Sequence, residues 1–93
     1  DRAPGTQFAL GPVTRLGRDI DNDVVLADPT ISGRHALLVS RDGAWWIEDL
    51  GSRNGIEVNR TRLTAAVPYV VRSGDAIGFG GVRVRLICPD EGE

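Results

Sequence analysis

Three short stretches of the chain contain side chains suited to binding an anion. Gly17-Arg18 ends an apolar run, Ser32-Gly33-Arg34 closes a loop that is rich in Asp and Asn, and Arg53-Asn54 lies in a later loop bounded by glycines. A phosphomonoester carries a charge of about −1.5 to −2 at pH 7 and three acceptor oxygens. Binding it at a surface requires a bidentate cation, a hydroxyl and backbone N–H donors. The residue types therefore predict one anion-recognition surface built from separate loops.

Each candidate phosphate ligand would have a different task. Arg18 offers a planar guanidinium, Ser32 offers a hydroxyl, and Arg34 adds a second charge. Gly33 has no side chain, so the main chain can approach the anion closely and direct its N–H group at it. A single Arg or Ser in a loop is usually a solvated or turn-forming residue. The combination is more specific because different parts of the chain contribute to it.

Two further polar residues have a structural interpretation beside the functional one. Asn54 followed by Gly55 fits a type I′ turn, which is the better interpretation of this pair in isolation. The amide of Asn54 can also pair with the main chain of an extended peptide, and both roles can hold. His35 is the only histidine and begins an apolar run. We expect it to be buried and to link loop backbones, because no nucleophile and orienting acid accompany it.

Composition limits the class of partner. The 93 residues, 41% of them hydrophobic, suffice for one domain with a modest core. The net charge of −2 argues against a nucleic-acid partner, and no apolar stretch approaches the ~20 residues of a membrane span. All eleven basic residues are Arg, a bias that genome composition explains at least as well as function. The single cysteine, Cys88, is expected to be a small buried hydrophobe, and the sequence indicates no cofactor and no metal.

The domain limits follow from composition along the chain. Residues 1–5 are polar and contain Pro and Gly, as expected of a linker remnant, and residues 89–93 form an acidic tail. We expect the folded domain to span residues 6–88. The chain contains no Met and no recognisable export signal, so we expect a domain of a larger, cytoplasmic protein.

The elements that must position the candidate residues are β-strands. Turn-forming residues recur about every ten positions and no window has a helical period, which favours an all-β sandwich or barrel. Apolar or alternating runs predict strands at residues 7–10, 13–17, 24–26, 35–40, 44–50, 56–58, 61–63, 67–71, 76–79 and 82–88.

One hairpin places most of the candidate residues together. Asp42-Gly43 between two apolar runs predicts a tight turn. The outer ends of these two strands must then meet at the opposite end, so the loop with Ser32 and Arg34 lies beside the loop with Arg53 and Asn54. The place of Arg18 stays open at this point, because a full strand at residues 24–26 would carry the chain to the other end.

These motifs resemble those of the forkhead-associated (FHA) domain, a phosphothreonine-peptide binding module. The family pattern is Gly-Arg, Ser-x-x-His, Ser-x-Asn-Gly and Val-Asn, which stand here at residues 17–18, 32–35, 52–55 and 58–59. The resemblance covers roughly residues 6–88. It departs from the family at Gly33, where a larger residue is frequent, and at Ile56, where Thr is common.

The resemblance implies an FHA-like β-sandwich of about eleven strands with recognition loops at one end. It implies phosphate binding by Arg18 and Ser32 with support from Arg34, and peptide binding by Arg53 and Asn54. Structural roles fall to the remaining motif residues, Gly17, His35 and Gly55. The implied partner is a phosphothreonine-containing protein, either a Ser/Thr kinase or its substrate.

Three alternatives compete with this function. Asp19, Asp21 and Asp23 have the spacing of a calcium loop, but Val24 and Thr30 replace the Gly and Glu that such a loop needs. An enzyme would require a Ser/His/Asp set, a Walker loop or a metal cluster, which the sequence does not contain. An FHA-type domain that binds a partner without phosphate, or packs against other domains of its own chain, remains an open alternative.

Overall fold

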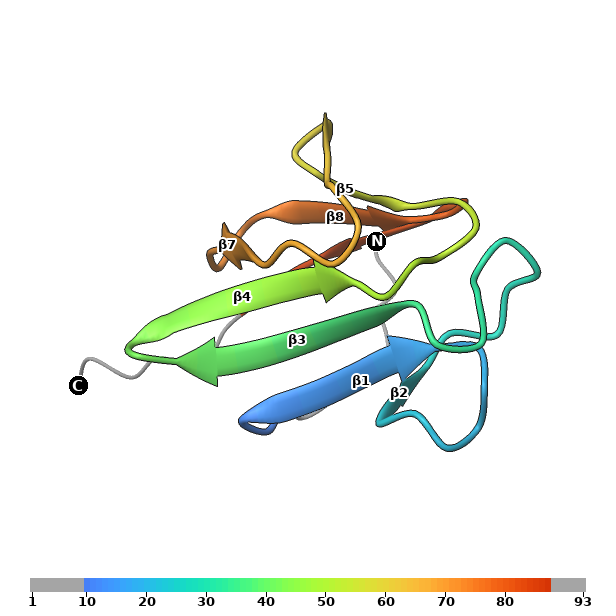
Figure 1. Cartoon of the computed structure of the whole chain (residues 1–93), viewed down its shortest axis with the longest axis horizontal. Coiled ribbons are helices and arrows are strands. Elements are labelled where there is room, and N and C mark those ends of the chain that lie inside the picture. The colour runs from blue at the N-terminus through green and yellow to red at the C-terminus, as the bar shows by residue number, and fades with distance from the viewer. Residues whose placement is uncertain (1–9, 88–93) are drawn as a thin grey trace, which may run out of the picture.

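The computed structural model describes residues 10–87, which form two β-sheets packed face to face (Figure 1). Nine strands lie within these residues, against about eleven expected. They are β1 (Val13–Gly17), β2 (Val24–Val25), β3 (Ala36–Arg41), β4 (Ala44–Asp49), β5 (Ile56–Val58), β6 (Thr61–Arg62), β7 (Tyr69–Val71), β8 (Ala76–Phe79) and β9 (Val82–Arg85). The expected strand at residues 7–10 lies outside the described residues except for Leu10, and Cys88 lies outside them altogether.

The first four strands of the chain form one sheet together with β7, and the other four strands form the second sheet. One sheet has the order β2-β1-β3-β4-β7 and the other the order β6-β5-β8-β9. Burial alternates with period two along β4, β5 and β8, so every second side chain points into the space between the sheets. The core that fills this space consists of Leu16, Val24, Ile31, Ala36, Leu38, Trp45, Ile47, Ile56, Val58, Leu63, Val71, Ile77, Phe79 and Leu86.

The predicted hairpin is confirmed. Asp42 and Gly43 have φ angles of 56° and 77°, as a type I′ turn requires, and Arg41 pairs with Ala44 across it. A second turn of this kind, at Asn59 and Arg60 with φ angles of 49° and 74°, joins β5 to β6. The sequence pattern predicted such a turn at residues 54–55 instead. Gly55 has a φ of 79° but Asn54 has no positive φ, so that prediction is wrong.

The short strand β2 decides where the chain goes after Arg18. The pattern predicted a strand at residues 24–26, and only Val24 and Val25 pair, in parallel with Leu16 and Gly17. Because β2 runs parallel to β1, the chain leaves both strands at the same end. The loops at residues 18–23, 26–35 and 50–55 therefore gather at one end of the sandwich, on the right in Figure 1, and the Asp42-Gly43 turn lies at the other.

Candidate anion-binding site

Arg18 is bound twice to the segment that contains Ser32. Its backbone N–H donates to the Ser32 carbonyl oxygen at 3.0 Å, and its side-chain Nε donates to the Ile31 carbonyl oxygen at 2.9 Å. Among the described residues, the two terminal nitrogens of the guanidinium have no hydrogen bond or ion pair. The side chain is thus held by one N–H, and the residue is exposed, so the rest of its donor fork is free to bind a ligand.

Ser32 joins the second and third loops. Its hydroxyl oxygen accepts the backbone N–H of Arg53 at 3.0 Å, and its own N–H donates to Nδ1 of His35 at 3.1 Å. A hydroxyl that accepts one hydrogen bond still has its proton to donate. Ser32 can therefore donate to an anion while its hydroxyl oxygen holds the Arg53 loop.

His35 has the buried linking position that the sequence predicted. The side chain is 0% exposed, and its ring lies edge-on to Phe79 with a centroid distance of 5.7 Å. Since Nδ1 accepts the Ser32 N–H, the proton must be on Nε2, which donates to the Gly55 carbonyl oxygen at 2.9 Å. Both ring nitrogens are occupied by the backbone of the recognition loops, which leaves neither free to act as a base.

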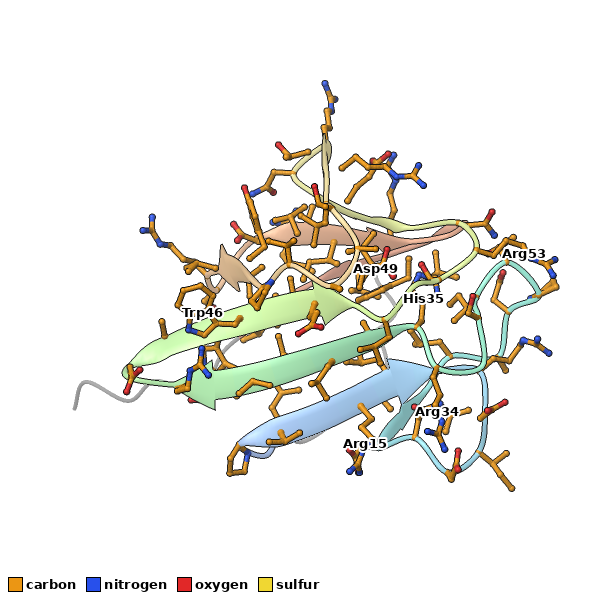
Figure 2. The ribbon with its side chains drawn as sticks, in the orientation of Figure 1. Arg15, Arg34, His35, Trp46, Asp49 and Arg53 are labelled. Carbon is orange, nitrogen blue, oxygen red and sulfur yellow. The ribbon has the colours of Figure 1, made fainter. Side chains whose placement is uncertain are left out.

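Asp49 and Ser52 shape the loop that follows β4. Asp49 is 3% exposed, and its Oδ1 accepts the Ser52 N–H at 2.8 Å. The hydroxyl oxygen of Ser52 in turn accepts the Gly55 N–H at 2.9 Å, which closes the loop on itself. Figure 2 shows His35 and Asp49 at this end of the sandwich and Arg53 farther out, on the loops.

The side-chain amide of Asn54 forms one hydrogen bond inside the protein, although the residue is exposed. Its Nδ2 donates to the Thr30 carbonyl oxygen at 2.7 Å, which attaches the third loop to the second. Its side-chain oxygen accepts no hydrogen bond from the described residues and the residue is exposed. That oxygen can accept a backbone N–H from an extended peptide.

The loop at residues 18–23 is fastened to Gly33. The Gly33 carbonyl oxygen accepts the Asp19 N–H at 3.1 Å and the Asn22 amide at 2.7 Å. Asn22 Nδ2 also donates to the Asp19 carbonyl oxygen at 2.9 Å. A Cβ at Gly17 would collide with the Gly33 carbonyl oxygen, so this contact requires glycine at position 17.

Two charged side chains modify the site. A methyl group at Gly33 would lie 2.7 Å from each carboxylate oxygen of Asp19, so this carboxylate lies over the Gly33 backbone. Arg34 is exposed and 3.8 Å from the carboxylate of Asp21, an ion pair of little energetic value. Figure 2 shows Arg34 below the outer part of the loops, apart from Arg53.

The three Asp residues with calcium-loop spacing do not gather. Asp19 lies over Gly33, Asp21 pairs with Arg34, and Asp23 accepts the Arg15 N–H at 2.8 Å. Within residues 10–87, no group of three or more His, Cys, Asp or Glu is placed to hold a metal ion.

Thr30 is the position that the sequence analysis missed. Its N–H and hydroxyl both donate to Asp28 Oδ1, its hydroxyl oxygen accepts the Gly81 N–H at 2.7 Å, and its carbonyl accepts from Asn54. The two bonds from Thr30 lower the pKa of Asp28 below its usual value of 3.8. The Asp-Pro-Thr sequence at 28–30 is typical of a side-chain-stabilised turn. This pattern is the sequence signal that could have indicated the structural role of Thr30.

Comparison with known proteins identifies the family of this fold. The FHA domain family matches residues 14–80. The chain is 40% identical over 83 residues to the FHA domain-containing protein FhaB of Mycolicibacterium smegmatis, covering 87% of this chain and 53% of that protein. It is 38% identical over 84 residues to the oxoglutarate dehydrogenase inhibitor of Corynebacterium diphtheriae, covering 89% and 57%.

A solved structure agrees as well. Mycobacterium tuberculosis EmbR in complex with a low affinity phosphopeptide superposes with a TM-score of 0.74 and 32% identity, over 80% of this chain and 19% of that one. The chain spans about half the length of the curated relatives named above. Of the residues described, none forms a helix long and apolar enough to cross a bilayer. With its motifs, its two-sheet fold and the matched span of residues 14–80, this chain belongs to the FHA domain family.

Proposed function

We propose that this domain, spanning residues 6–88, binds phosphothreonine-containing proteins and is part of a larger, cytoplasmic signalling protein. The observation that carries the proposal is that Arg18 is bonded to the segment of Ser32, through its side-chain Nε to the Ile31 carbonyl and through its backbone N–H to the Ser32 carbonyl. A dianionic phosphate needs both a cationic fork and a neutral donor, and the Arg18 guanidinium and the Ser32 hydroxyl are groups of these two kinds.

The roles of the other residues follow from the same geometry. The Gly33 N–H has no hydrogen bond within the described residues and can add a backbone donor to the phosphate. Arg34 contributes charge at longer range. Arg53 and the free side-chain oxygen of Asn54 contact the peptide, while Gly17, His35 and Gly55 maintain the loops. Because the EmbR relative was solved with a phosphopeptide, a phosphorylated partner is the natural ligand to test.

The partner is a Ser/Thr kinase or one of its substrates. Phosphothreonine rather than phosphoserine is expected from the family resemblance, and the domain itself catalyses no reaction. The relative named an oxoglutarate dehydrogenase inhibitor suggests that such a domain can act by binding and restraining an enzyme. Recruitment or restraint of a kinase-pathway protein is the corresponding activity here.

The decisive experiment compares variants of Arg18 and Ser32 by isothermal titration calorimetry with a phosphothreonine peptide. Arg18→Ala should weaken binding by about 1.5–3 kcal/mol, roughly tenfold to a hundredfold, and Ser32→Ala by less. Arg18→Lys should not restore full affinity, because an ammonium lacks the planar fork. Arg15→Ala is the matched control, since Arg15 is exposed on β1 outside the recognition loops (Figure 2).

Comparing phosphothreonine, phosphoserine and unphosphorylated peptides distinguishes this proposal from a scaffold that binds without phosphate. Binding should be lost with the unphosphorylated threonine peptide and reduced with phosphoserine. It should weaken as the pH falls through about 6, where the phosphate dianion gains a proton and loses one of its two charges. Equal affinity for phosphorylated and unphosphorylated peptides would establish the phosphate-independent scaffold instead, and unchanged affinity in Arg18→Ala would refute the site.

A further inference from the structure

The outer face of the four-stranded sheet has a row of charged residues around one glycine. Cross-strand pairing aligns Arg62 with Glu57, Glu57 with Gly78, and Gly78 with Arg83, so these four positions lie in one row on one face. Ile56 and Val58 on either side of Glu57 are buried, which confirms that the row faces away from the core. None of these residues was assigned to the phosphothreonine site.

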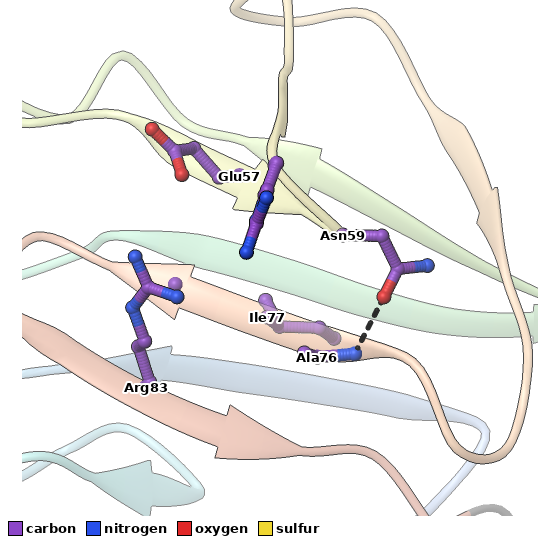
Figure 3. Close-up of a pocket in the computed structure, with 7 residues that line it drawn as sticks. Glu57, Asn59, Ala76, Ile77 and Arg83 are labelled. Atoms are coloured by element: carbon purple, nitrogen blue, oxygen red, sulfur yellow. Dashed lines mark hydrogen bonds between the residues drawn. The ribbon is translucent and has the colours of Figure 1, made fainter.

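A pocket of about 320 Å³ opens on this face. Figure 3 shows Glu57 on one side of it, Arg83 on the other, and Asn59 bonded to Ala76 at one end. Gly78 contributes to the floor, and a Cβ built there would meet its nearest neighbour, Glu57 Cβ, only at 3.9 Å. The missing side chain therefore leaves open space between Glu57 and Arg83.

Arg60 also lines this pocket, in a backbone conformation that disfavours it. It is the second residue of the β5–β6 turn, with a φ of 74°, where glycine would be more stable. Within the described residues, neither Arg60 nor Arg83 has a hydrogen bond or ion pair for its guanidinium. Arg85, on the same sheet, instead donates to the Gly74 carbonyl oxygen at 2.7 Å. Two guanidinium groups without partners thus border one recess.

We infer that this pocket is a second anion-binding site, which binds a carboxylate of an acidic segment in a partner protein. Two guanidinium groups and the Glu57 carboxylate leave a local charge of +1, which matches a single carboxylate better than a dianion. The net charge of −2 makes nucleic acid an unsuitable occupant, because its binding depends on many phosphate contacts. Asn59 is already bonded to Asp75 and Ala76, so Arg60 and Arg83 are the binding groups.

This site goes beyond the proposed function and can be tested apart from it. The probe is an unphosphorylated hexaglutamate peptide with blocked ends, titrated into the ¹⁵N-labelled chain and followed by amide chemical shifts. A Ser-Gly hexapeptide is the neutral control. The Arg18→Ala variant removes the main candidate phosphate ligand, so shifts that persist in it at the residues of this pocket do not depend on that ligand.

We expect saturable shifts at Glu57, Asn59, Gly78 and Arg83 in both wild type and Arg18→Ala. Arg83→Gln should weaken hexaglutamate binding about threefold to tenfold, whereas Arg15→Gln, which removes the same charge from the other sheet, should change it less than twofold. Gly78→Thr should block the pocket without changing any charge, and its Cβ would meet no atom closer than the Glu57 Cβ at 3.9 Å.

Arg60→Gly separates a loss of binding from a loss of stability. It should weaken binding while raising the melting temperature by about 2–5 °C, because glycine relieves the left-handed backbone. Shifts confined to the recognition loops and abolished by Arg18→Ala would overturn the proposal. So would equal losses in Arg83→Gln and Arg15→Gln, which would indicate general charge attraction, or the absence of saturable shifts.

Discussion

The carboxylate of Asp19 lies over the backbone of Gly33, and these two residues follow Arg18 and Ser32, the two side chains proposed to bind the phosphate directly. A negative charge there opposes the binding of a dianion, since the screening length at physiological salt is about 8 Å. Because Gly33 has no side chain, the carboxylate occupies space that a larger residue at this position would fill. The departure from the family pattern at Gly33 thus changes the electrostatics of the site rather than only removing a contact.

Asp19→Asn is therefore expected to increase affinity for a phosphothreonine peptide, by about twofold to fivefold at low salt. Calorimetry at 50 mM and 500 mM salt checks this, because screening should shrink the gain. Asp42→Asn, in the turn at the opposite end of the sandwich, removes the same charge and should have no comparable effect. A loss of affinity in Asp19→Asn would show that the carboxylate supports the site.

His35 is the residue on which loop geometry depends most. Replacement by Phe would keep a ring against Phe79 but leave the Ser32 N–H and the Gly55 carbonyl without partners. We expect a loss of about 2–5 kcal/mol in the free energy of unfolding, measured by urea denaturation. Arg34→Ala, at the exposed neighbouring position, should remain within about 0.5 kcal/mol. A loss below 1 kcal/mol in His35→Phe would contradict the linking role.

At the scale of elements, the short strands of the second sheet depend on links between their loops. β5 and β6 have three and two residues, too few to be stable alone. Asn59 in their turn exchanges two hydrogen bonds with the backbone of Ala76 and donates a third to Asp75 Oδ1 at 3.0 Å. Asp75 Oδ2 also accepts the Arg72 N–H at 2.8 Å. One carboxylate thus joins the β5–β6 turn to the loop before β8.

These bonds, that from Asn59 first, lower the pKa of Asp75 below its usual value of 3.8. The folded state therefore holds this proton less tightly than the unfolded state, so the stabilisation is present above about pH 4 and is lost as the pH falls through the lowered pKa. Asp75→Asn should make the decline in melting temperature between pH 5 and pH 2 shallower. Asp42→Asn, whose carboxylate is highly exposed, is the control that should leave the decline unchanged. An unaltered pH profile in Asp75→Asn would contradict this assignment.

At the scale of the whole molecule, three loops that are distant in sequence form one unit. Arg18 is bonded to the segment of Ser32, Ser32 to Arg53, and Asn54 to Thr30, while Thr30 also accepts from Gly81 in the β8–β9 turn. A ligand that contacts Arg18, Ser32 and Asn54 would therefore add to bonds that already connect both sheets. Binding should therefore raise the free energy of unfolding of the whole domain and not only order the loops.

The thermal midpoint tests this coupling. At a phosphothreonine-peptide concentration of 100 times Kd, binding should add about 2.7 kcal/mol and raise the melting temperature by roughly 10 °C or more. Arg18→Ala should show a much smaller rise at the same peptide concentration. Amide exchange gives the complementary measurement, with protection expected in β3 and β4 as well as in the loops. A rise that is equal in both proteins would show that the peptide binds elsewhere.

The sequence by itself determined the class of fold and most of its strands. Alternation with period two and regularly spaced turn residues are local properties, so they predicted the β3–β4 hairpin and its Asp42-Gly43 turn. The buried role of His35 also followed from local sequence, because the residue begins an apolar strand without catalytic partners. The gathering of Ser32 and Arg53 required only that two antiparallel strands end together.

Only the tertiary structure decided the position of Arg18, the turn type near Asn54 and the hydrogen bonds by which Thr30 connects Asp28, Asn54 and Gly81. Each depends on hydrogen bonds between residues far apart in the chain, such as Arg18 with Ile31, Asn54 with Thr30 and Thr30 with Gly81. Local propensity favoured a type I′ turn at residues 54–55, but the bond from Asn54 to the neighbouring loop accompanies a different conformation. These features are set by hydrogen bonds between segments that meet only in the folded chain. A pattern of residue types contains no information on which distant carbonyl a donor will reach.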